Sequence, residues 1–140
     1  MIHSYRAHQV LTCEENKRVF KLHTNGFEFI EKRIDNGECN RGRTCDYLIT
    51  KETQDIQIFI ELKGSRIKDA FEQLISSYEQ HKIANSKAFS AIVSSRFPQR
   101  DTSILVLQNQ ARKYFQELFI KNKILETKYN PNTNEIEKTN

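Results

Sequence analysis

The sequence lacks any long run of apolar residues. None of its apolar stretches approaches the roughly 18 residues of a membrane-spanning helix. The first ten residues also lack the apolar stretch that a signal peptide needs. We therefore expect a cytoplasmic protein that does not insert into a membrane.

Cysteine is scarce as well. Cys13, Cys39 and Cys45 make an odd number, and no two of them form a Cys-x-x-Cys pair. This argues against the disulfide framework of a small secreted domain and favours reduced thiols. Internal repeats and the signatures of helix-turn-helix, zinc-finger and RNA-binding modules are also missing, so the sequence indicates none of these classes.

What the chain does contain is enough for one globular domain. It has 140 residues, of which 37% are hydrophobic and 29% charged, and nine Phe and five Tyr supply large core side chains. The formal net charge of +4 permits a polyanionic partner. We expect a single domain over residues 1–129, followed by a polar and flexible tail over residues 130–140.

The first third of the chain predicts a helix and then a hairpin. A helix over residues 1–16 is indicated by apolar residues and one acid at helical spacing, namely Ala7, Val10, Leu11 and Glu14. Alternation over residues 18–34 predicts a hairpin, with Asn25-Gly26 as a type I′ turn.

The rest of the chain predicts strands and helices in alternation. Strands are expected at residues 45–50, 56–63, 88–95 and 123–129. One helix carries the stripe Ile67, Phe71, Leu74 and Tyr78. A second helix, capped by Asp101 or Ser103, carries the stripe Ile104, Leu107, Ala111, Phe115, Leu118 and Phe119. The order predicts an α/β or α+β domain with a mixed sheet.

Two charges interrupt the most apolar strand near its end. Side chains alternate along a strand, so Gln57, Phe59, Glu61 and Lys63 share the face opposite to Ile56, Ile58, Ile60 and Leu62. If strands 45–50 and 56–63 pair antiparallel, Asp46 lies beside Glu61. Two carboxylates and a lysine then converge, which suits Mg²⁺-assisted attack of water on a phosphodiester. The alternative is a charged strand face with Asp46 in a turn.

The run of Asp46, then Glu61-Leu62-Lys63 fifteen residues later, then a helix, resembles the PD-(D/E)xK nuclease superfamily over residues 45–95. The resemblance implies a restriction-endonuclease-like core, with a mixed sheet of four to five strands flanked by helices in α-β-β-β-α-β order. It also implies that Asp46, Glu61 and the Leu62 carbonyl bind Mg²⁺, for which Mn²⁺ can substitute. Lys63 would act on the attacking water.

The chain departs from the family pattern at several positions. Cys45 stands where many members have Pro. An additional acid on the first helix would be Glu14 or Glu15. The Gln and Tyr that some members carry on the following helix correspond to Gln73 and Tyr78, which are five residues apart rather than four. Tyr78 also fits the apolar stripe of its helix, which favours a role in core packing.

Basic residues in the expected loops can contact a phosphate backbone. They are Arg41, Arg43, Arg66, Lys68, Arg96 and Arg100. We expect a Mg²⁺-dependent DNA endonuclease that works as a homodimer. Two alternatives stay open, a Holliday-junction resolvase and a non-catalytic module that kept the nuclease fold and binds nucleic acid or protein. The sequence does not distinguish DNA from RNA.

Overall fold

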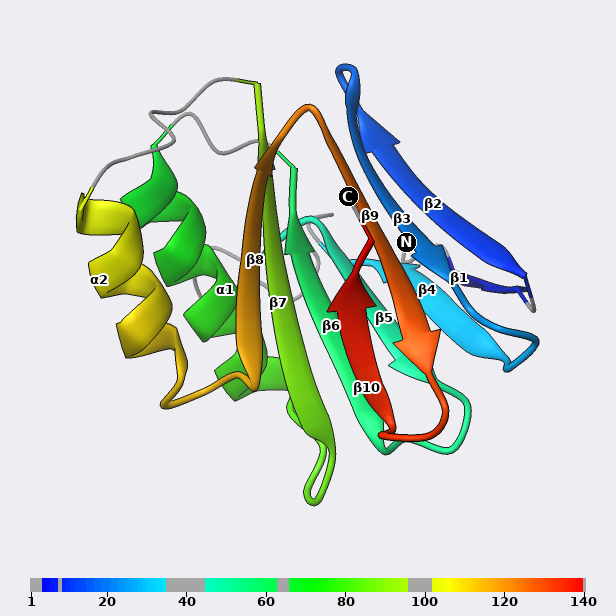
Figure 1. Ribbon diagram of the computed structural model, residues 1–140. Coiled ribbons are helices and arrows are strands. Elements are labelled where there is room, and N and C mark those ends of the chain that lie inside the picture. Colours follow the sequence, from blue (N-terminus) through cyan, green and yellow to red (C-terminus); the bar gives the residue numbers. More distant parts are fainter. Residues whose placement is uncertain (1–3, 8, 35–44, 63–65, 96–101, 140) are drawn as a thin grey trace.

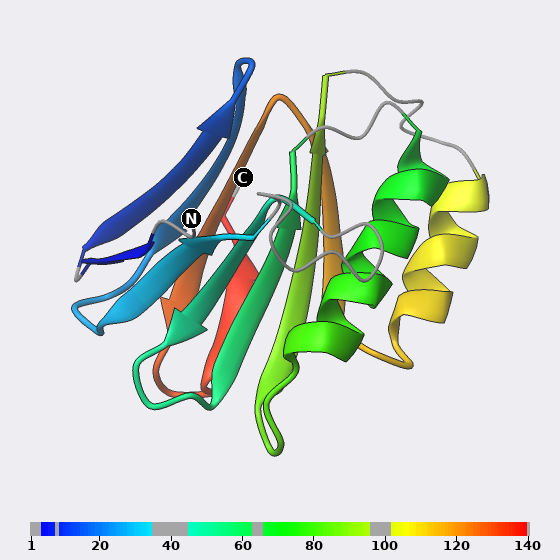
Figure 2. The ribbon, with the colours of Figure 1, turned by 180° about the vertical axis from the view of Figure 1, so that it is seen from behind.

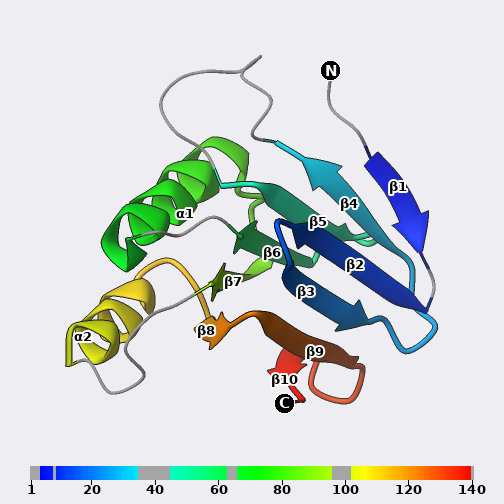
Figure 3. The ribbon, with the colours of Figure 1, turned by 90° about the horizontal axis from the view of Figure 1, so that it is seen from above.

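The computed structural model describes residues 4–7, 9–34, 45–62, 66–95 and 102–139, which form ten strands and two helices in three layers (Figures 1 and 3). A six-stranded sheet in the order β1-β4-β5-β6-β7-β8 forms the middle layer. Helices α1 and α2 cover one face, and a four-stranded sheet in the order β10-β9-β3-β2 covers the other. None of these described helices is long and apolar enough to cross a membrane.

The strands of the central sheet are β1 (Ser4–Ala7), β4 (Phe29–Arg33), β5 (Tyr47–Lys51), β6 (Ile56–Glu61), β7 (Lys87–Ser94) and β8 (Glu117–Asn122). The second sheet contains β2 (Val10–Glu15), β3 (Arg18–His23), β9 (Ile124–Asn130) and β10 (Glu135–Lys138). The helices are α1 (Ile67–His81) and α2 (Thr102–Ala111).

The middle of the chain folds as expected. Strands β4, β5 and β6 pair antiparallel, α1 then crosses one face of the sheet, and β7 pairs parallel to β6 (Figure 2). The predicted α/β class with a mixed sheet is confirmed. The central sheet has six strands rather than four or five, and the four-stranded second sheet was not predicted.

The N-terminal helix is a wrong prediction, because residues 4–7 and 10–15 form strands β1 and β2. In β2, Leu11 and Cys13 are buried while Thr12 and Glu14 are exposed, which is the period of two that a half-buried strand requires. The tight turn that follows has positive φ at both central residues, 50° at Asn16 and 65° at Lys17. It joins β2 to β3.

The predicted hairpin over residues 18–34 is also wrong. Its two strands exist, and the turn residues Asn25 and Gly26 have positive φ of 55° and 82°. However, β3 pairs with β2 and β9, whereas β4 pairs with β1 and β5 in the other sheet. Both edges of β3 are therefore already occupied by other strands.

Two predictions at the C-terminal end are corrected. The second helix ends at Ala111, and Leu118 and Phe119 belong to β8. Successive residues of β8 are buried on opposite faces, Leu118 under the helices and Phe119 between the sheets. Within the tail expected over residues 130–140, residues 135–138 form β10, which pairs with β9, and Ile136 is only 2% exposed.

The hydrophobic core has two parts. The alternate residues Ile56, Ile58, Ile60 and Leu62 pack between the two sheets, as their shared face predicts. On the opposite face, Phe59 packs under the helices together with Phe71, Leu74 and Phe115. The face that carries Glu61 is therefore the face that α1 covers.

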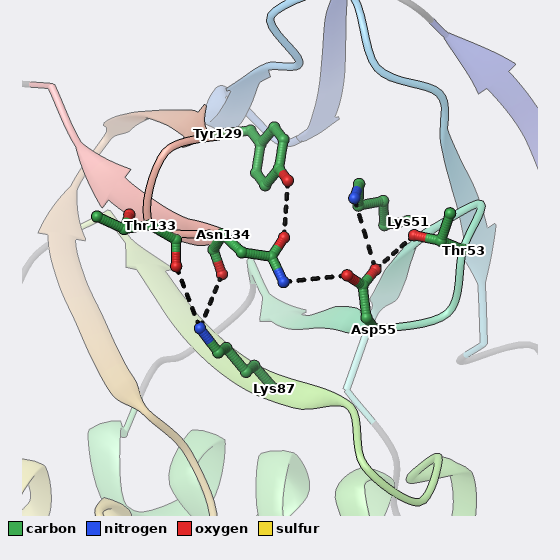
Figure 4. A network of polar contacts seen from close by, with 7 residues as sticks. All are labelled: Lys51, Thr53, Asp55, Lys87, Tyr129, Thr133 and Asn134. Atoms are coloured by element: carbon green, nitrogen blue, oxygen red, sulfur yellow. Dashed lines mark hydrogen bonds and ion pairs between the residues drawn. The ribbon is translucent and has the colours of Figure 1, made fainter.

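A polar network ties the second sheet to the central sheet at the β5–β6 turn (Figure 4). The side chain of Asn134 donates to Asp55 Oδ2 at 3.0 Å and accepts from the Tyr129 hydroxyl at 2.7 Å. Lys51 Nζ lies 3.6 Å from Asp55 Oδ1, and Lys87 Nζ donates to the Asn134 carbonyl at 3.3 Å. These contacts hold the β9–β10 turn against β5, β6 and β7.

Candidate active site

The pairing of β5 with β6 brings Asp46 and Glu61 together. Tyr47 lies opposite Ile60 in the antiparallel register, so the next step places Asp46 opposite Glu61. Directly opposed Cα atoms in such a pair are about 4.5–5.5 Å apart, and their side chains share one face of the sheet. The antiparallel pairing on which the sequence analysis based this juxtaposition is present.

Backbone hydrogen bonds fix the position of Asp46. Its Oδ2 atom accepts from the backbone N–H of Leu62 at 2.8 Å, and its carbonyl accepts from the backbone N–H of Ile34 at 3.0 Å. Asp46 is 2% exposed and Glu61 is 3% exposed. The two carboxylates therefore lie below the surface, at the end of β6 that precedes α1.

Helix α1 packs directly over this end of the sheet. The backbone N–H of Cys45 donates to Ser77 Oγ at 2.6 Å, and Ser77 Oγ donates to the Gln73 carbonyl at 2.9 Å. Burial raises the pKa of Cys45 to about 12, and the carboxylates of Glu61 and Asp46 also act to raise it, while the Ser77 hydrogen bond acts to lower it. Cys45 is thus a neutral thiol beside the carboxylate pair.

Several predicted site residues lie outside the described part of the chain. Lys63 is one of them, so the structure places two of the three proposed catalytic residues. The same holds for four of the basic residues expected to contact phosphate, Arg41, Arg43, Arg96 and Arg100. Arg66 and Lys68 are described and exposed, and Arg66 forms an ion pair of 3.2 Å with Asp69.

The expected additional acid is not on a helix. Glu14 and Glu15 lie on β2 of the second sheet, where Glu14 is exposed and Glu15 forms an ion pair of 3.2 Å with Arg33. Tyr78 packs edge to face against Phe59 and Phe115, which agrees with the expected core role.

Sequence reasoning missed one buried acid. Glu31 on β4 is 8% exposed, and the Cys13 thiol donates to its Oε1 at 3.3 Å. Burial first, and then the charges of Glu31 and Asp46, hold the pKa of Cys13 well above its ordinary value. The signal was available, because Phe27, Phe29 and Glu31 alternate, which places an acid where the pattern calls for an apolar residue.

The donor atoms at this site suit a hard cation. Asp46 and Glu61 carry carboxylate oxygens, which are ligands that Mg²⁺ accepts. Within the described residues, no three His, Cys, Asp or Glu side chains form a group that could hold a metal ion. A Mg²⁺ site here would therefore rest on two carboxylates, completed by water.

Comparison of the chain with protein-family models, with curated proteins and with solved structures found no match, so any functional assignment rests on the residues described above.

Proposed function

We propose that the chain is a metal-dependent DNA endonuclease that hydrolyses phosphodiester bonds, with Asp46, Glu61 and Lys63 as its catalytic residues. The observation that carries the proposal is the β5–β6 register, which sets Asp46 opposite Glu61 where β6 ends. Two buried carboxylates repel each other, and a divalent cation compensates both charges.

The order of elements around the pair supports the proposal. Strands β4, β5 and β6, helix α1 and strand β7 follow the β-β-β-α-β part of the order expected for a restriction-endonuclease-like core. The first helix of that order is replaced here by strands β1 to β3. The carboxylates still lie at the strand end that leads into the crossover helix.

Each residue has a distinct role in this proposal. Asp46, Glu61 and the Leu62 carbonyl would hold Mg²⁺ or Mn²⁺. The bound cation would supply Lewis-acid activation of the attacking water and the phosphate. Lys63 would orient that water and receive its proton, and the exposed Arg66 and Lys68 would contact neighbouring phosphates.

A homodimer in the cytoplasm fits this activity. One domain of 140 residues offers little surface to grip a duplex, and a pair of sites can act on two strands. A stable interface buries at least about 1,200 Å² in total. Light scattering at micromolar concentration, with and without DNA, should give the mass of two chains, and the mass of one chain in both cases would contradict the dimer.

The activity is tested with several substrates. Plasmid DNA, single-stranded DNA, RNA and a four-way junction are each incubated with the protein in Mg²⁺, Mn²⁺ or EDTA. We expect cleavage that requires metal and is lost in Glu61→Gln and in Lys63→Ala. Preference for the junction would identify a Holliday-junction resolvase. Cleavage at the wild-type rate by either variant would assign the activity to other residues or to a contaminant.

A second candidate function is a non-catalytic module that binds nucleic acid or protein. The observation that favours it is the deep burial of Asp46, whose side chain already satisfies the Leu62 N–H. A structural role for this acid needs no metal. Binding to nucleic acid without cleavage in any metal would support this candidate over the nuclease.

A further inference from the structure

A cavity of about 310 Å³ lies on the helix-side face of the central sheet, beside the last turn of α1. Alternate residues of neighbouring strands form its floor, namely Ile30, Lys32, Leu48, Thr50 and Gln57. His81 and Ile83 contribute its wall. This volume is at the lower end of the range for small-molecule sites, so the cavity suits one small ligand or one unit of a polymer.

The buried side chain of Gln57 joins the floor of this cavity to its wall. Gln57 is 1% exposed, and its Nε2 donates to the His81 carbonyl at 2.9 Å while its Oε1 accepts from the Ile83 N–H at 3.0 Å. These two bonds fix the end of α1 to β6. The cavity is therefore held in shape before any ligand arrives.

The lining combines apolar residues with polar and charged ones, among them Lys51, Glu52 and Gln54 at the β5–β6 turn. Ile30, Leu48 and Ile83 offer apolar surface, whereas Lys32 and His81 offer hydrogen-bond donors. Burial first, and then the charge of Lys32, lowers the pKa of His81 below its ordinary value. Both side chains line the same cavity, and the neutral imidazole donates one hydrogen bond without a full charge.

The cavity shares its face of the sheet with the carboxylate pair. Leu48 and Thr50 lie two and four residues beyond Asp46 on β5, which is about 7 to 13 Å at 3.3 Å per residue. A helical strand of nucleic acid advances about 3.4 Å per nucleotide. The cavity thus lies within a few nucleotides of a phosphate held at Asp46 and Glu61.

We propose that the cavity binds one unpaired nucleotide of the substrate strand, with its phosphate at Lys32 and His81 and its base against Ile30, Leu48 and Ile83. A lysine ammonium is a common phosphate ligand, and the apolar walls suit the face of a base. A base inside a continuous duplex cannot enter such a cavity. The inference rests on the proposed nuclease function and narrows its substrate to single-stranded or branched nucleic acid.

Binding is measured by NMR on the Glu61→Gln variant in EDTA, so that no cleavage takes place. The probes are thymidine monophosphate, inorganic phosphate, a single-stranded oligothymidylate and a blunt duplex of equal length. We expect thymidine monophosphate and the single strand to shift the resonances of Thr50, Ile83 and the Gln57 side chain in a saturable way. Inorganic phosphate should bind at least about tenfold more weakly, because it lacks the base.

Two charge reversals provide a matched comparison. Lys32→Glu should weaken binding of the single strand by about tenfold or more, since it removes a charge-assisted contact. Lys82→Glu makes the same charge change at an exposed lysine outside the cavity lining. This variant should weaken binding of the single strand by less than about twofold. The inference would be overturned if both reversals weakened binding of the single strand equally. It would also be overturned if the ligands shifted only resonances of other residues, or if the duplex bound as tightly as the single strand. Metal-dependent cleavage by the wild type is scored separately, so failure at the cavity is distinguishable from failure of the nuclease proposal.

Discussion

Oδ2 of Asp46 accepts a hydrogen bond of 2.8 Å from the backbone N–H of Leu62. The side chain of the residue before β5 thus satisfies the backbone of the residue that follows β6. The register of β5 and β6, continued by one residue, sets Asp46 opposite Glu61. Asp46 therefore combines a structural bond with its proposed role as a metal ligand, and substitutions can separate the two.

Replacing Asp46 by Ala should destabilise the fold, whereas Asn should be tolerated. Asp46→Ala leaves the buried Leu62 N–H without its acceptor, which costs about 1–3 kcal/mol. Asp46→Asn keeps a side-chain oxygen and should lose less than about 1 kcal/mol. Urea denaturation measures both, and both variants should lose cleavage. Equal stability of wild type and Asp46→Ala would show that the hydrogen bond contributes nothing.

Glu61→Gln should abolish cleavage without lowering stability. Loss of a supporting residue around a metal site already costs about 10–100-fold, so loss of a ligand should lower cleavage by more than about 100-fold. The melting temperature should stay the same or rise, because Asp46 then no longer faces a second carboxylate. Glu79→Gln, at an exposed position on α1, is the matched control and should retain full cleavage. A large drop in the melting temperature of Glu61→Gln would indicate a structural role instead.

The central strands were predictable because their signals are local. Residues 56–62 alternate between the two cores, and a short turn joins β5 to β6, so the sequence alone placed Asp46 beside Glu61. Strand β2 was not predictable in the same way. Val10, Leu11 and Glu14 fit a helical spacing, and only pairing with β3 and burial of Cys13 favour the strand.

Contacts between residues far apart in the sequence explain why the hairpin prediction was wrong and why the cavity was not predicted. Strand β3 lies between β2 and β9, and β9 is about a hundred residues away along the chain. No turn signal at Asn25-Gly26 can reveal that partner. Likewise, the cavity beside His81 gathers residues from three strands and the end of α1. Its formation depends on Gln57 bonding to the segment after the helix, which sequence spacing does not indicate.

Strand β10 should be essential for stability. Ile136 is 2% exposed in the core between the sheets, so Ile136→Ala should cost about 2–5 kcal/mol in the free energy of unfolding. Lys138 lies in the same strand at an exposed position. Lys138→Ala should therefore change the free energy of unfolding by less than about 0.5 kcal/mol. Thermal and urea denaturation measure both variants. A chain ending at residue 130 should be less stable still, and full stability of that truncated chain would contradict the structural role of β10.

Asp55 should make stability depend on pH in the acid range. Burial alone would raise the pKa of Asp55, but hydrogen bonds from Thr53 and Asn134 and the nearby charge of Lys51 outweigh burial and hold this pKa below its ordinary value of 3.8. A carboxyl group with a lowered pKa in the folded state stabilises the fold above its unfolded pKa. That stabilisation is lost as the pH falls through the folded value. The wild type should therefore lose this contribution below about pH 4.

The test compares Asp55→Asn with the wild type in urea at several pH values from 6 to 2. The variant should be less stable at pH 6, and the difference should shrink as the pH falls, because protonated Asp55 loses the same charge. Lys87→Met is the control, since it removes hydrogen bonds to Thr133 and Asn134 in the same network without removing an acid (Figure 4). Its destabilisation should stay constant over this range. A difference for Asp55→Asn that stays constant or grows on acidification would show that the charge of Asp55 does not stabilise the junction between the two sheets.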